Sequence, residues 1–162
     1  MSHPLPSISP QLAAIAPGFR ALSITVNAAP LRDASIGEAA LATACQAVLA
    51  GQPAWAEDHL AAWSTVFKAF GAKPKRTPCS AEALRKRVLR EGAMPAIDPV
   101  VDLYNAVSLR YAVPVGGENI AAYCGAPRLV IADGSELFDT MKEGLAAVES
   151  AEPGEVIWRD DR

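Results

Sequence analysis

Few residues in this sequence could bind a metal ion or form a cross-link. The three cysteines, Cys45, Cys79 and Cys124, lie far apart, and the two histidines do not complete a set of ligands. Zinc sites instead draw four such ligands from closely spaced pairs. The odd number and wide spacing of the cysteines therefore predict free thiols in a reducing compartment. We expect neither a metal nor a cofactor.

Long apolar segments are also missing. No segment approaches the roughly 20 uninterrupted apolar residues that cross a bilayer. The N-terminal MSHPLPSISPQL lacks the basic stretch and apolar core of a secretory signal. We therefore expect a cytoplasmic protein with no membrane partner. With 162 residues, 51% hydrophobic and 20% charged, the chain can bury a core within one domain.

Positive charge is scarce overall but concentrated in one segment. The net charge is −3, yet residues 73–90 hold seven of the fifteen basic residues and a single acid, Glu82. Such a segment favours contact with RNA phosphates, although a solvated helix face would have the same composition. The candidate RNA-binding residues are Lys73, Lys75, Arg76, Lys86, Arg87 and Arg90.

Helical patterns fill the first two thirds of the chain and strand patterns the last third. We predict a loose arm over residues 1–10 and a partly helical connection over 137–148. This order predicts an α+β fold, with helices packed on a small mixed or antiparallel sheet. The predicted helices span residues 11–16, 35–50, 54–70, 81–91 and 99–112, and the predicted strands span 19–28, 128–132 and 155–159.

Three helix starts are marked by capping residues. Ser35 and Glu38 have the spacing of a capping box. Ser80 precedes the helix over 81–91 as its cap. Asp98 precedes Pro99, and proline is well tolerated in the first helical turn. These residues predict where the helices begin and require no function.

Short motifs follow one another in order through the second half of the chain. They are Val101-Asp102, Tyr104-Asn105, Ser108-Leu109-Arg110, Pro114-Val115-Gly116-Gly117 and Gly154-Glu155-Val156. This series resembles a known family, the B3/B4 domain of the phenylalanyl-tRNA synthetase β subunit. The similarity is greatest to free-standing proteins built from that domain and covers residues 10–162. It implies an α+β domain that binds the aminoacylated 3′ end of tRNA, and a hydrolase that edits in trans by cleaving the ester of a mischarged amino acid.

The sequence departs from the family pattern in two places. Gly116 stands near the position of a histidine associated with the editing pocket of the synthetase. The family also continues past the Gly154-Glu155-Val156 strand with further strands. We therefore expect a single B3/B4-like domain over residues 11–162 that lacks those C-terminal strands.

Candidate site residues follow from the chemistry of deacylation, which needs an aimed water and a stabilised oxyanion. No catalytic triad is recognisable, and the neighbours of Cys124 offer no base, so we expect no covalent nucleophile. Glu118 is the catalytic candidate, as the group that orients water or grips an α-amino group. The alternative is a solvated loop acid. Gly116 and Gly117 permit positive φ and close approach of the backbone to substrate, and they also suit a plain turn.

Asp102 and Asn105 lie one helical turn apart in an otherwise apolar helix. A buried polar group needs a partner, so both residues could brace the 113–118 turn. Alternatively, Asn105 lies at the floor of the pocket and binds substrate, with Asp102 bracing the site. Two further functions stay open for the chain: an RNA-binding module without catalysis, and a binder of small molecules.

Overall fold

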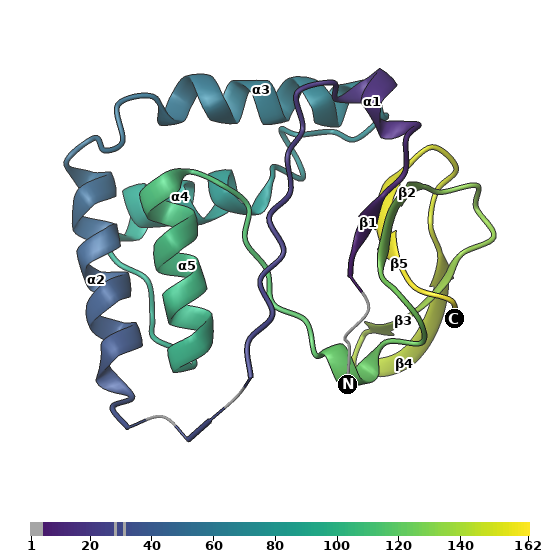
Figure 1. The fold of residues 1–162 in the computed structure, drawn as a ribbon. Helices are drawn as coiled ribbons and strands as arrows, with labels where there is room; N and C mark the ends of the chain where they lie inside the picture. The colour runs from purple at the N-terminus through teal and green to yellow at the C-terminus, as the bar shows by residue number, and fades with distance from the viewer. Residues whose placement is uncertain (1–4, 28, 31) are drawn as a thin grey trace. The chain divides into compact units, whose positions relative to one another are not determined.

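Helices and strands separate along the chain as expected for an α+β fold (Figure 1). The computed structural model describes residues 5–27, 29–30 and 32–162. The helices are α1 (Leu12–Ile15), α2 (Ser35–Leu49), α3 (Ala56–Ala69), α4 (Ser80–Glu91), α5 (Pro99–Tyr111) and the 3-10 turn η1 (Ile120–Ala122). The strands are β1 (Ser7–Ile8), β2 (Arg128–Ile131), β3 (Leu137–Lys142), β4 (Leu145–Ser150) and β5 (Val156–Arg159).

The chain divides into two compact units, and the single domain predicted over 11–162 stays a prediction. The helical unit comprises Val26–Thr65 and Lys73–Glu118. The sheet unit comprises the chain up to Thr25, Val66–Ala72 and Asn119–Arg162. Helix α3 contributes to both. No helix in the described part of the chain has both the length and the apolar character to cross a membrane.

The helical unit is built around α2, α4 and α5, which lie side by side (Figure 1). Val48, Val88 and Leu109 are fully buried where these helices meet. Each such side chain contributes about 1.5–3 kcal/mol by leaving water. The remaining core members are small or medium-sized, so the helices can approach closely. They are Leu41, Ala44, Cys45 and Ala106.

The closest approach in the helical unit is between Gly37 of α2 and Pro99 at the start of α5. A Cβ atom added to Gly37 would lie 2.6 Å from the Pro99 carbonyl oxygen. Real Cβ atoms do not approach backbone so closely. Glycine at this position therefore sets the distance between the two helices.

The observed helix starts confirm only one of the predicted caps. The Asp98 carboxylate accepts hydrogen bonds from the amides of Val100 and Val101, at 2.9 and 3.3 Å. Ser35 is instead the first residue of α2, and its amide and hydroxyl both donate to Asp33. Cys79, rather than Ser80, is the cap residue of α4. The predicted capping box was therefore wrong, because a carboxylate two residues upstream supplies the acceptor.

The sheet unit contains a mixed three-stranded sheet of order β1-β2-β5. Strand β1 runs parallel to β2, and β2 pairs antiparallel with β5 in the register Leu129 to Trp158. This pairing confirms the two C-terminal strands that the sequence predicts. Part of the predicted N-terminal arm is also ordered here, because Ser7 and Ser9 donate amides to the carbonyls of Pro127 and Leu129. Residues 1–4 of that arm lie outside the described residues.

Two predicted elements were wrong. Residues 19–27 form no strand, and Leu22, Ile24 and Val26 are exposed; Ala28 lies outside the described residues. An alternating pattern becomes a strand only where a neighbour completes its hydrogen bonds. Residues 137–148 fall in the hairpin β3–β4 instead of a partial helix. Its turn has positive φ at Glu143 and Gly144, as two-residue hairpin turns require.

Candidate functional site

Helix α5 presents most of the predicted site residues, and its start is held by Asp102. This side chain is 2% exposed, and its carboxylate accepts a hydrogen bond from the Ile97 amide at 3.0 Å. The bond joins the helix to the segment before it. Asp102 therefore fastens the N-terminal end of α5, whereas we expected it to hold the 113–118 turn.

The other end of α5 is held by Ser108 and Ala112. The Ser108 hydroxyl donates to the Val113 carbonyl at 2.6 Å. Ala112 takes the left-handed conformation at φ 47° and ψ 38°, where a non-glycine residue is strained. Together they turn the chain sharply after the helix. Ser108 thus makes the bond to the turn that we had assigned to Asp102 and Asn105.

The turn brings Gly117 back against the helix. A Cβ atom at Gly117 would lie 3.5 Å from the Tyr104 ring, which is ordinary contact, and one at Gly116 would meet nothing within 4 Å. Neither glycine has positive φ, contrary to the expectation from sequence. The backbone at 116–117 is exposed, and so is Glu118, which makes no ion pair among the described residues.

Asn105 is the residue of this region with an unmet hydrogen-bonding capacity. It is only 9% exposed, yet its side chain has no hydrogen-bond partner among the described residues. A carboxamide offers two donors and an acceptor, and neither polar atom of Asn105 is among the fully buried atoms that lack a partner, so solvent reaches the amide. Tyr104, the preceding residue of the helix, lies beside Gly117.

The predicted RNA-binding residues divide into two groups. On α4, Lys86 pairs with Glu82 at 2.6 Å, while Arg87 and Arg90 share Glu91 at 2.8 and 2.6 Å. These two arginines hold the pKa of the Glu91 carboxyl below its usual value. In the turn before α4, the basic side chains are exposed and make no ion pair among the described residues. These are Lys73, Lys75 and Arg76.

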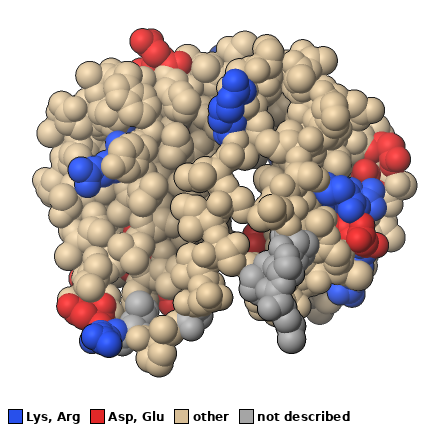
Figure 2. Space-filling view, viewed as in Figure 1, with Lys and Arg blue, Asp and Glu red and all other residues tan. Residues whose placement is uncertain are grey.

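The remaining basic residue of α4, Arg85, is buried. Its guanidinium donates to the carbonyl oxygens of Gln52, at 2.9 Å, and Leu109, at 3.4 Å, and its Nε has no partner. The side chain therefore joins three segments of the helical unit and is not available to RNA. On the face drawn in Figure 2, charged side chains lie in small separate groups on a mostly uncharged surface.

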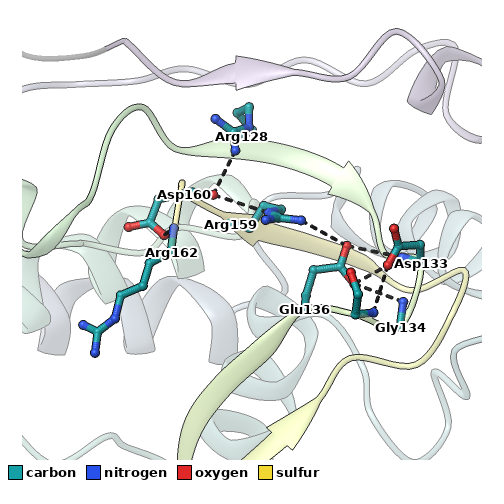
Figure 3. Close-up of polar contacts among 8 residues, drawn as sticks. Arg128, Asp133, Gly134, Glu136, Arg159, Asp160 and Arg162 are labelled. Carbon is teal, nitrogen blue, oxygen red and sulfur yellow. Dashed lines mark hydrogen bonds and ion pairs between the residues drawn. The ribbon is translucent and has the colours of Figure 1, made fainter.

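The sheet unit holds the densest polar network, but its groups satisfy one another (Figure 3). The Glu136 carboxylate accepts from the amides of Asp133 and Gly134 and pairs with Arg159 at 3.5 Å. The backbone amide of Glu136 itself, and then those of Asp133 and Gly134, lower the pKa of the Glu136 carboxyl. Arg128 donates to the Asp160 carbonyl at 2.9 Å. The network fastens the turn after β2 to β5, and most of its charged groups bond one another.

The cavity of the helical unit is small for the aminoacylated adenosine of a charged tRNA. In the helical unit, a cavity of about 140 Å³ is lined by Cys45, Gln46 and Met94 among others. That volume is below the roughly 300–1,000 Å³ of typical ligand pockets. Burial raises the pKa of the Cys45 thiol, so it is not a reactive thiolate. All three cysteines are free, and no cluster of potential metal ligands occurs among the described residues.

Comparison with known families identifies the family of the chain. The model of the B3/4 domain family matches residues 62–162, well over half of the chain. The chain belongs to the B3/4 domain family. This confirms the resemblance found from the motifs, as well as the α+β class. Membership in this family fits a protein module that is related to tRNA binding and editing. No curated protein and no solved structure matches this B3/4 protein.

Two contributors to the site were not predicted from the sequence. Tyr104 was noted only as part of a motif, although its ring receives Gly117. Ser108 likewise lay within a motif, and only its position five residues before Val113 hinted at a helix-end bond. Both act through contacts between the helix and the chain that follows it, which periodicity alone does not reveal.

Proposed function

We propose that this B3/4 protein binds tRNA and hydrolyses the ester of mischarged aminoacyl-tRNA in trans. The observation that carries the proposal is Asn105, a mostly buried residue whose carboxamide has no hydrogen-bond partner among the described residues, in the helix that leads to the exposed 116–118 backbone. Such a carboxamide can bond a substrate without first giving up a bond within the protein.

In the proposed reaction, water attacks the carbonyl carbon of the ester. The Glu118 carboxylate accepts a proton from that water as the new carbon–oxygen bond forms. The Asn105 amide and the amides of Gly116 and Gly117 donate to the developing oxyanion. The ester bond then breaks, and the ribose oxygen takes the proton from Glu118. Asp102 supports the site indirectly by fixing the start of α5.

The proposed tRNA contact is the turn that carries Lys73, Lys75 and Arg76, with Lys86, Arg87 and Arg90 of α4 contributing less. The turn is favoured because its charges are exposed and unpaired, whereas those on α4 are partly neutralised by Glu82 and Glu91. Each phosphate contact releases counterions, so binding should weaken steeply as salt rises.

Deacylation of a panel of mischarged tRNAs tests the proposal. We expect release of at least one noncognate amino acid, and a fall of about 10²-fold or more in Glu118→Gln. Asn105→Ala should lower the rate by roughly 10²-fold through loss of an oxyanion donor. Absence of hydrolysis across the panel would refute the enzymatic proposal, and an unchanged rate in Glu118→Gln would remove that residue from the mechanism.

The second candidate function is tRNA binding without catalysis. The exposed Glu118 favours it, since no ion pair among the described residues holds the carboxylate in a catalytic position. This function predicts salt-dependent binding of tRNA, equal for correctly charged and mischarged forms, with no release of amino acid.

A further inference from the structure

Charge is segregated within the helical unit. Residues 33–67 contain four acids and no lysine or arginine, whereas residues 73–90 are strongly basic. Two of those acids, Glu57 and Asp58, lie in the first turn of α3. Both are exposed, and neither forms an ion pair among the described residues. The start of α3 is therefore a negatively charged surface without a counterion from its own unit.

A large aromatic side chain lies at the same place. Trp55 precedes α3 and is 48% exposed. Its ring meets His59 edge to face, with centroids 5.7 Å apart at 88°. Trp63 in turn donates its Nε1–H to His59 Nε2 at 3.1 Å. The His59 ring is therefore held between the two tryptophans. The Trp55 ring is thus supported on one side by an oriented neighbour.

Helical spacing places a carboxylate beside this ring. Asp58 follows Trp55 by three residues and His59 follows it by four, so the three side chains share a face of the helix. Ala62, one turn beyond Asp58, presents only a methyl group there. This face of α3 therefore combines the Trp55 ring with the Asp58 carboxylate, which has no ion pair among the described residues. The small side chain of Ala62 leaves space beside them.

We propose that Trp55 and Asp58 form a docking site for an arginine side chain from a basic segment of a protein partner. A guanidinium stacks on an aromatic face and can bond a carboxylate with two parallel N–H groups. Glu57 adds attraction at longer range. RNA fits this surface less well, because the two carboxylates repel phosphates. The site lies outside the residues of the proposed deacylation, so neither proposal depends on the other.

Binding of a short arginine peptide to the full chain tests this site. The probe is acetyl-Arg-Gly-Arg-Gly-Arg-amide, and the control peptide has citrulline, which is neutral and of nearly the same shape, in place of arginine. The signals followed are the indole N–H resonances. Trp55→Ala and Asp58→Asn should each weaken binding by roughly three- to tenfold. Trp158→Ala removes a tryptophan that is 51% exposed on β5 and should leave the affinity unchanged.

The following outcomes distinguish an arginine-binding site from other kinds of binding surface. Equal binding of the citrulline peptide, or unchanged affinity in both Trp55→Ala and Asp58→Asn, would overturn the proposal. The proposal would also be overturned if oligouridylate bound more tightly than the arginine peptide and Trp55→Ala weakened that binding. Such a result would identify a surface for nucleobases. If the chain self-associates in sedimentation experiments and Asp58→Asn abolishes the association, the site is supported. The partner is then a second copy of the chain.

Discussion

Asn105 and Ser108 lie on the same buried face of α5 but differ in their bonds. Ser108 donates to Val113, whereas Asn105 has no partner among the described residues. We expect Ser108→Ala to lower the free energy of unfolding by about 1–2 kcal/mol, because it leaves a helix-end carbonyl unsatisfied. Asn105→Ala should cost less than about 1 kcal/mol, since no bond is lost.

Urea denaturation of the two variants, followed by far-UV circular dichroism, measures this difference. Similar large losses in both would mean that Asn105 has a structural partner, and its proposed role in binding substrate would lose its support. The comparison is matched, because the two positions share a helix and similar burial.

Arg85 is a buried cation that has no acid partner among the described residues. Its guanidinium bonds only carbonyl groups, and its Nε is unsatisfied. Arg85→Ala should destabilise the protein by about 2–4 kcal/mol, through a cavity and two orphaned carbonyls. Arg85→Met keeps most of the apolar stem and removes the unsatisfied Nε, so it should cost less than Arg85→Ala.

The control for Arg85 is Arg90→Met on the same helix, where the side chain is exposed. It should change the free energy of unfolding by no more than about 0.5 kcal/mol. If Arg85→Ala proved equally mild in thermal unfolding, Arg85 would not be the link between α4, α5 and the Gln52 turn.

At the scale of the elements, the contact between α2 and α5 depends on Gly37. Helix propensity alone would make Gly37→Ala stabilising by about 1 kcal/mol. The added Cβ atom would lie 2.6 Å from the Pro99 carbonyl oxygen, so the helices must separate instead. We expect a net loss of about 1–3 kcal/mol, measured by chemical denaturation. A stabilised variant would show that the two helices approach less closely than described.

The basic turn and helix α4 are expected to contribute unequally to tRNA binding. Lys75→Glu with Arg76→Glu removes exposed, unpaired charges and should reduce the affinity at moderate salt by more than tenfold. Arg87→Glu with Arg90→Glu removes charges already shared with Glu91 and should have a smaller effect. Filter binding with tRNA over a salt series tests both pairs. A larger effect on α4 would place the RNA contact on the helix.

At the scale of the whole molecule, paired carboxylates in both units set the response to acid. Hydrogen bonds to Ser35 in the helical unit, and to Cys124 in the sheet unit, hold the pKa of Asp33 and of Asp160 below the ordinary 3.8. A lowered folded-state pKa stabilises the protein above the ordinary value, and this stability is lost as pH falls through the lower value. Glu136 behaves likewise, relative to 4.5.

Burial acts at the opposite end of the pH scale, where it raises the pKa of Cys45 and Cys79 above 9.0. The stability from these neutral thiols is complete below pH 9.0 and is lost as pH rises through the folded values. The melting temperature should therefore be nearly constant from about pH 5 to 8 and fall on both sides. A rise in melting temperature on acidification below pH 4 would contradict the assigned partners.

The sequence by itself determined the elements that local chemistry specifies. Asp98-Pro99 was sufficient to place the start of α5, because an N-cap acts within three residues. The α+β order and the pair β2–β5 followed from periodicity, and the motif series was specific enough to indicate the B3/4 family. The free cysteines followed from their spacing.

Tertiary structure alone decided what depends on contacts between distant residues. The hairpin β3–β4 was missed because its Leu, Met, Lys, Ala and Glu residues favour helices, and only strand pairing overrides that preference. Residues 19–27 alternate but find no partner strand. In the site, the bond of Asp102 to Ile97 and the free amide of Asn105 depend on how α5 packs. A side chain's partners are set by the packed neighbours, which the order of residues does not specify.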